Sequence, residues 1–228
     1  MKLTDFIPDV RVPLGKKGRH KIESYTVSVQ EATYHCMSMA IKDRLEEGII
    51  PGTYTRLVRD DGTIVMSDAI SERRDHIEFI EEAFGMVLIN GLGLGMTIEP
   101  IIRKDQVDHV IVVEKEQDVI DLVAPTYLKR YSQGLSIVKA DAFSFELNQC
   151  PDVVWNDIWD YISDENVPEM KRLHEKYANA SWCDSWARER CENFREIVEK
   201  EMYTSVDVVF ERLDAAGFTL AAPEEEHG

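Results

Sequence analysis

Apolar and polar positions along the middle of the chain fall into blocks that predict alternating strands and helices. Short apolar runs bounded by glycine or polar residues predict buried strands at 86–89, 109–114, 135–141 and 152–157. Helical spacing of apolar residues predicts helices between the strands, over 94–103 and 116–131. Alternation at this spacing implies right-handed β-α-β crossovers, so we expect an α/β fold with a Rossmann-like, doubly wound and mainly parallel sheet.

The residues before the first strand predict an arm, a helix, a β-hairpin and a second helix. Residues 1–21, rich in proline and glycine, predict a mobile arm whose basic cluster GKKGRHK is a solvated loop. A helical pattern over 26–47 ends at Gly48, which is typical of a position just after a helix. Two strand-like runs flank Asp61-Gly62, a strong hairpin signal, and Ser71 is the expected N-cap of a helix that reaches about Phe84.

After Asp160 the alternation ends, and the pattern predicts helices at 167–178, 185–203 and 205–217. No fifth strand is evident, so the sheet is expected to be shortened after its fourth strand and covered by a helical C-terminus. The expected organisation is an N-terminal part at 1–84, a Rossmann-like binding domain at 85–220, and an acidic tail at 221–228.

The composition and net charge of the chain limit the classes of partner that it is expected to bind. The 43 acidic and 26 basic residues give a formal net charge of -17, which disfavours nucleic acid and anionic membranes because both require a basic surface. A small-molecule or cationic acceptor fits this charge better, and a homo-oligomer stays open. The four cysteines form no C-x-x-C pair, so reduced thiols and a cytoplasmic location are expected, with no metal site. No apolar run is long enough to span a membrane.

Three glycines at alternate positions follow the first predicted strand. Gly91, Gly93 and Gly95 allow positive φ angles and close approach of a ligand to the backbone. We expect the helix after them, from Leu94 to Arg103, to present its N-terminus to an electron-rich ligand group. The alternative is a tight turn between a core strand and a helix.

Acidic residues end the other three predicted strands. Glu114 lies about twenty residues beyond the glycines, where a carboxylate can accept both hydroxyls of a ribose. Asp141 ends the third strand next to the small Ala142, and Asp157 and Asp160 follow the fourth. Because ligands of open α/β sheets bind at the carboxyl ends of strands, these residues predict one site. The alternatives are an exposed strand end for Glu114 and helix capping near Asp164 by the last two aspartates.

The glycine spacing G-x-G-x-G differs from the G-x-G-x-x-G of NAD-binding proteins, because position 96 is Met. Together with the strand-end residues, it resembles class I S-adenosylmethionine-dependent methyltransferases. The hairpin, the IEFI segment, the glycine loop, VVE, DA and the D-x-x-D of NDIWD more closely resemble the spermidine synthase branch, over about 53–165. The combination is similar to spermidine synthase-like or methyltransferase-like proteins of bacteriophages and bacteria.

The resemblance implies a site for S-adenosylmethionine or its decarboxylated form. The glycine loop would contact the methionine part, Glu114 the ribose and Asp141 the adenine. Asp157 would deprotonate the acceptor, and Asp160 would help to hold it. The implied cofactor-binding positions are Gly91, Leu92, Gly93, Gly95, Glu114, Lys115, Asp141, Ala142 and Asp157; the implied catalytic ones are Asp157 and Asp160.

Two departures bear on the reaction. Ile158 and Trp159 fill the D-x-x-D spacer, which is usually Ser-Ser in aminopropyltransferases, and Ile77 replaces the histidine of their H-E-M element. The sequence therefore favours methyl transfer, with aminopropyl transfer as the alternative. A non-catalytic protein that retains the cofactor-binding fold, and an NAD-dependent dehydrogenase, stay open as rival classes.

Overall fold

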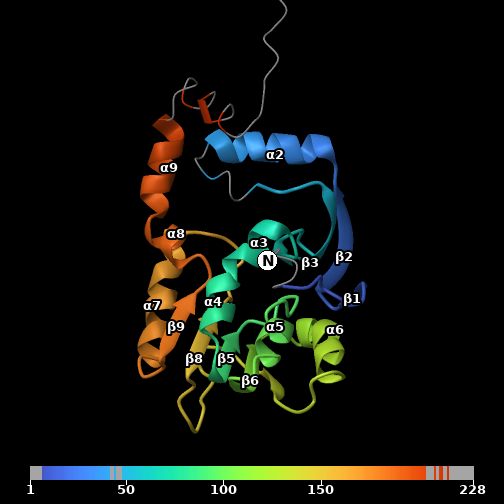
Figure 1. Cartoon of the computed structure of the whole chain (residues 1–228), viewed down its shortest axis with the longest axis vertical. Helices are drawn as coiled ribbons and strands as arrows, with labels where there is room; N and C mark the ends of the chain where they lie inside the picture. Colours follow the sequence, from blue (N-terminus) through green and yellow to red (C-terminus); the bar gives the residue numbers. More distant parts are fainter. Residues whose placement is uncertain are drawn as a thin grey trace, which may run out of the picture.

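The computed structural model describes residues 7–41, 44, 48–203, 208, 211, 212 and 215. Within these residues the chain forms an antiparallel sheet near the N-terminus and a parallel sheet after it (Figure 1). The predicted tail at 221–228 and most of the helix predicted at 205–217 lie outside the described residues. No described helix has the length and apolar character that crossing a membrane would need.

The first sheet has the strand order β1-β2-β3-β4, with every neighbouring pair antiparallel. Its strands are β1 (Gly15–Lys17), β2 (His20–Val27), β3 (Gly52–Arg59) and β4 (Ile64–Ser67). The hairpin predicted around Asp61-Gly62 is confirmed as β3–β4, with Gly62 at φ 90°.

The predicted mobile arm is wrong over the basic cluster, which forms the β1–β2 hairpin. The cause is a long-range contact that local composition does not reveal. The Arg19 backbone N–H donates to the Asp118 carboxylate at 2.9 Å. A side chain at Gly18 would place its Cβ 2.2 Å from that same carboxylate, so glycine permits the close packing.

Two of the predicted N-terminal helices have different bounds in the structure. Helix α2 (Val29–Ile41) starts after Ser28, which forms a capping box with Glu31, rather than at Thr26. The single helix predicted up to Phe84 is two, α3 (Ile70–Asp75) and α4 (Ile77–Glu82), and its N-cap is Ala69 rather than Ser71.

The second sheet has the order β7-β6-β5-β8-β9, and all neighbouring strands are parallel. Its strands are β5 (Gly85–Asn90), β6 (Val107–Glu114), β7 (Leu135–Lys139), β8 (Val153–Asn156) and β9 (Trp182–Ser185). Numbered within this sheet, the order is 3-2-1-4-5, that of a Rossmann-like sheet, with its topological switch point between β5 and β8.

The expectation that the sheet stops after its fourth strand is wrong, because β9 pairs with β8 from Val153↔Trp182 to Asn156↔Ser185. Its four residues, WCDS, alternate too little to predict a strand. They pair only on one side, at the edge of the sheet, so tertiary context rather than local pattern determines this strand.

Helices cover both faces of the parallel sheet, as predicted for a doubly wound fold (Figure 1). Helices α4, α5 (Ile98–Ile102) and α6 (Gln117–Leu128) pack with Val87 and Ile89 on one face. Helix α7 (Val167–Lys176) and Cys191 of α8 (Arg188–Glu192) pack with Leu88 on the other. Helix α9 (Phe194–Tyr203) follows α8.

The proposed boundary between residues 84 and 85 stays a prediction. Phe79 and Ile80 of α4, on its N-terminal side, are buried in the same core as Val87 of β5. The helix expected after the glycines is shorter than predicted, since α5 contains five residues and begins at Ile98.

Candidate active site

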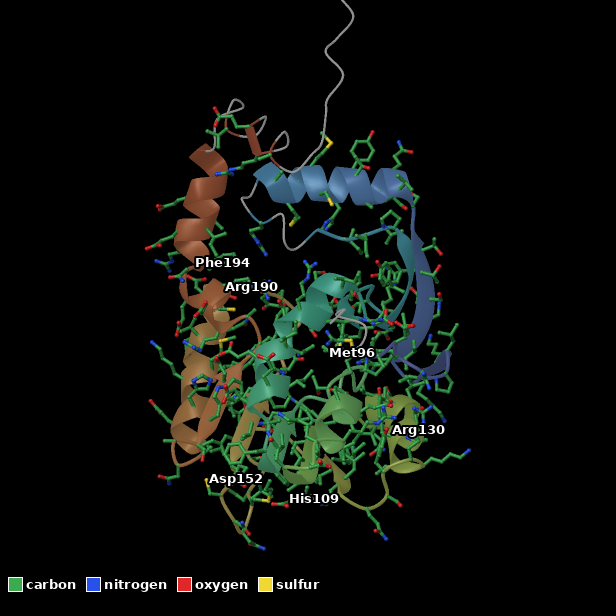
Figure 2. The ribbon with its side chains drawn as sticks, in the orientation of Figure 1. Met96, His109, Arg130, Asp152, Arg190 and Phe194 are labelled. Atoms are coloured by element: carbon green, nitrogen blue, oxygen red, sulfur yellow. The ribbon has the colours of Figure 1, made fainter. Side chains whose placement is uncertain are left out.

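A cavity of about 330 Å³ lies at the carboxyl edge of the parallel sheet, against the antiparallel sheet. In Figure 2, Asp152 and His109, close to the amino ends of β8 and β6, are at the bottom, so the carboxyl ends point towards the N-terminal sheet. Eight of the predicted site residues line the cavity: Gly91, Gly93, Glu114, Lys115, Asp141, Ala142, Asp157 and Asp160. Its volume is within the range of small-molecule sites, about 300–1,000 Å³.

The three positions require glycine because neighbouring parts of the protein occupy the space that a side chain would need. A Cβ on Gly91 would lie 1.9 Å from the Asp157 carbonyl oxygen, so the backbone just after β5 is in close contact with the backbone just after β8. A Cβ on Gly93 would lie 2.6 Å from the Met66 sulfur. All three glycines have positive φ angles, 102°, 49° and 70°. The glycine loop is therefore both a tight turn and a wall of the cavity.

Two residues predicted to bind cofactor do not line the cavity. A Cβ on Gly95 would lie 2.4 Å from the Tyr127 ring, whose hydroxyl donates to the Leu94 carbonyl at 2.8 Å. The Leu92 side chain is buried in the core, 4% exposed. The structure gives both residues a packing role in the turn. The short α5 also presents no helix N-terminus to the cavity of the kind expected after the glycines.

Glu114 is buried and fastens the glycine loop to the end of β6. One carboxylate oxygen accepts from the Leu92 N–H at 2.9 Å, and the other accepts from the Glu116 N–H at 2.8 Å. The exposed-strand-end alternative for Glu114 is therefore wrong. Each carboxylate oxygen has a second lone pair, so ribose hydroxyls can still donate to this residue where it lines the cavity.

Asp141 lies in the loop after β7, two residues beyond the end of the strand. Its Oδ1 accepts from the Phe143 N–H at 2.9 Å, and its Oδ2 lies 3.4 Å from the Lys115 ammonium. The small Ala142 beside it is buried and lines the cavity. Lys176 of α7 holds this loop, because its ammonium donates to the carbonyls of Ala142 and Phe143, each at 3.2 Å, and to that of Phe145.

Asp157 is the most perturbed acid of the site. Its side chain is 12% exposed, and burial, with smaller contributions from Glu72, Asp75 and Glu114, raises its pKa to about 8. His76 Nε2 lies 4.0 Å from Asp157 Oδ2, and burial lowers the pKa of His76 to about 4. Near neutral pH the histidine is therefore uncharged, and the protonated acid is the favoured form of Asp157.

Asp160 is paired with the N-terminal sheet. Its two oxygens accept from Nη2 of Arg59, at the end of β3, at 3.2 Å and 2.9 Å. The helix-capping alternative for these aspartates is wrong, because the Ser163 side chain caps the turn at Asp164 by accepting from the Glu165 N–H. The described residues contain no group of three or more histidine, cysteine or acidic side chains placed to hold a metal.

One wall of the cavity comes from the N-terminal sheet and was not predicted from the sequence. This wall consists of His20, Leu57, Arg59, Val65 and Met66. His20 is 3% exposed, with Nδ1 3.6 Å from Asp118 Oδ2. No local motif marks these residues as functional. Only the hairpin signal at Asp61-Gly62 indicated that a second sheet precedes the glycine loop.

The chain has distant likenesses among solved structures. They include a spermidine synthase in complex with the transition state analogue AdoDATO (TM-score 0.45, 15% identity, 89% of this chain and 62% of that chain). Spermidine synthase from Thermotoga maritima is another (TM-score 0.38, 19% identity, 67% of this chain and 50% of that chain). A third is a dimethyladenosine transferase from Plasmodium falciparum (TM-score 0.32, 20% identity, 38% of this chain and 30% of that chain). The chain thus spans less than two thirds of each of these structures. No protein-family model matches this chain, and no curated protein sequence matches it.

Proposed function

We propose that the chain is an S-adenosylmethionine-dependent transferase whose site is the cavity at the carboxyl edge of the parallel sheet. The observation that carries the proposal is the lining of this cavity: the glycine loop, Glu114, Asp141 and Asp157, one contribution from the carboxyl end of each of the neighbouring strands β5, β6, β7 and β8. Glu114 is the last residue of β6, and Asp141 and Gly91 follow the strands on either side of it, β7 and β5. An adenosyl ligand can therefore lie along the edge with adenine, ribose and sulfur in that order, since neighbouring strands are about 4.8 Å apart.

The chain's own residues fit such a ligand. Glu114 retains acceptor capacity for ribose hydroxyls, and Ala142 leaves space beside Asp141 for a ring. The ligand supplies an electrophilic carbon attached to a positively charged sulfur. A cation near Asp157 favours ionisation of this acid, so ligand binding prepares it to accept the proton of a nucleophile.

Methyl transfer is our first proposal and aminopropyl transfer the alternative. The aminopropyltransferase resemblance implies that Asp160 holds an acceptor amine, but Arg59 already neutralises that carboxylate. The pairing supports a reaction that does not require an ammonium group at this position. The acceptor we propose is a small molecule, or a cationic group drawn to the acidic protein. The non-catalytic alternative depended on a shortened sheet, and β9 removes that support.

Calorimetric titration tests the proposal with S-adenosylmethionine, its decarboxylated form, S-adenosylhomocysteine, 5′-methylthioadenosine and NAD in parallel. We expect saturable binding of the adenosyl sulfur compounds and none of NAD. Tighter binding of decarboxylated S-adenosylmethionine than of S-adenosylmethionine would favour aminopropyl transfer. Absence of binding by every adenosyl compound at millimolar concentration would refute the proposal.

A further inference from the structure

Met66 of β4 lies on the glycine loop, inside the cavity. Its sulfur accepts from the Leu94 N–H at 3.3 Å. A Cβ built on Gly93 would lie 2.6 Å from this sulfur and 2.9 Å from the terminal methyl carbon. Met66 and Gly93 both line the cavity, so the thioether side chain fills the space next to the loop.

The Leu94 N–H donates to a weaker hydrogen-bond acceptor than the neighbouring backbone N–H groups do. The N–H groups of Gly91 and Gly95 donate to backbone carbonyls, and that of Leu92 donates to Glu114. A thioether sulfur is only a weak acceptor, so a ligand oxygen is a stronger partner for the Leu94 N–H. Methionine has three rotatable side-chain bonds and can be displaced at little cost in packing.

The position of Met66 also follows from the order of strand ends. With adenine at Asp141 and ribose at Glu114, a sulfur attached to the ribose points towards the loop after β5. A second substituent on that sulfur then meets Gly93, Leu94 and the Met66 side chain. Ligand and Met66 compete for one volume.

We propose that Met66 is a specificity-determining residue that sets the length of the sulfur substituent accepted by the cavity. With Met66 on the loop, adenosyl thioethers with a short substituent bind without rearrangement. Those with a long substituent, with or without a carboxylate, bind only when the methionine side chain moves away from the Leu94 N–H. The inference rests on the proposed function, since it concerns adenosyl ligands.

Two neutral thioethers provide the test, because they differ in the sulfur substituent: methyl in 5′-methylthioadenosine, and an amino-acid chain in S-adenosylhomocysteine. We expect Met66→Ala to shift the ratio of the two dissociation constants about tenfold or more in favour of S-adenosylhomocysteine, a size typical of side-chain volume changes in an apolar site. Met66→Leu keeps the volume but lacks the sulfur, and we expect its ratio to stay within about threefold of the wild type.

Met86→Ala is the matched control, because it removes the same atoms from β5 outside the cavity lining. Its ratio should equal that of the wild type. Binding of both thioethers by all variants with an unchanged ratio in Met66→Ala would overturn the inference and leave the proposed function intact. Failure of wild type and variants to bind either ligand would overturn both. A ratio that shifts as much in Met66→Leu or in the control would also overturn the assignment to side-chain volume at position 66.

Discussion

The surroundings of Asp157 favour its protonated, neutral form, although the proposed reaction requires the ionised carboxylate as a general base. Burial is the main cause, and the nearby carboxylates of Glu72, Asp75 and Glu114 act in the same direction. His76 faces it at 4.0 Å but is held uncharged by its own burial. Arg59 also lines the cavity, but its guanidinium is paired with Asp160. A cationic ligand is thus the missing partner that would stabilise the ionised carboxyl group.

We therefore expect S-adenosylmethionine to release about one proton when it binds at pH 7, because a cation beside Asp157 lowers a pKa of about 8. Calorimetry in two buffers of different ionisation enthalpy measures the release. S-adenosylhomocysteine, with a neutral sulfur, is the control and should release less. Asp157→Asn should abolish the difference between the buffers and lower turnover about a hundredfold, the lower range for loss of a general base. Equal enthalpies in both buffers for the wild type would contradict this prediction.

At the residue scale, the sequence predicted the part of the site that lies at the carboxyl ends of the parallel strands. Gly91, Glu114, Asp141 and Asp157 could be found because parallel strands bring their carboxyl ends to one edge. Met66 could not, because its contact with Leu94 joins a strand of the antiparallel sheet to the loop after β5, 28 positions further along the chain. The shared role of the glycines as packing positions was likewise set by distant partners.

At the scale of elements, α7 supports the loop that follows β7. The Lys176 ammonium replaces water as the partner of the loop carbonyls and also lies 3.6 Å from Glu146. An aliphatic side chain of similar length would leave these carbonyls without their donor. The loop carries Asp141 and Ala142, so its order bears directly on the adenine end of the proposed site.

We expect Lys176→Met to weaken adenosine binding about fivefold, the effect of roughly one net hydrogen bond, by loosening this loop. Hydrogen exchange at the Phe143 and Phe145 amides, which are held by Asp141, should become faster. Lys171→Met is the matched control, since Lys171 is exposed on the same helix. Unchanged exchange in Lys176→Met would show that the lysine does not order the loop, even if overall stability falls.

The elements themselves were predicted unevenly, for a physical reason. The strands β5, β6 and β8 contain continuous apolar runs because both their faces are covered, and such runs are visible locally. The edge strand β9 is half-buried, and the β1–β2 hairpin depends on the docking of Gly18 and Arg19 against Asp118. Both are specified by long-range contacts, so their own residues give no clear pattern.

At the scale of the whole molecule, the two sheets meet through contacts around the cavity. Arg59 bridges to Asp160, Met66 to Leu94, and the β1–β2 turn to Asp118. The chain also carries a net charge of -17, and two of its acids, Asp157 and Glu72, are largely buried. Burial raises the pKa of Glu72 to about 7, although the Ser67 N–H and hydroxyl donate to it. Ionising these acids inside the fold adds negative charge to a protein that already has an excess of it.

We therefore expect the free energy of unfolding to fall between pH 6.5 and pH 8.5. In this window Asp157 and Glu72 are ionised in the unfolded chain, whereas their raised pKa values of about 8 and 7 keep protons on the folded chain. The folded state binds more protons, so stability decreases as pH rises and levels off above the folded pKa values. His76, with a pKa of about 4, opposes this trend where the unfolded histidine binds a proton, which is mostly below pH 6.5 and only weakly by about pH 7.5. Urea unfolding at pH 6.5, 7.5 and 8.5 measures the slope, and Asp157→Asn should reduce it, most clearly between pH 7.5 and 8.5, where Glu72 is largely ionised in both states. A slope that is identical in the wild type and Asp157→Asn would show that Asp157 already ionises in the folded protein near its ordinary pKa.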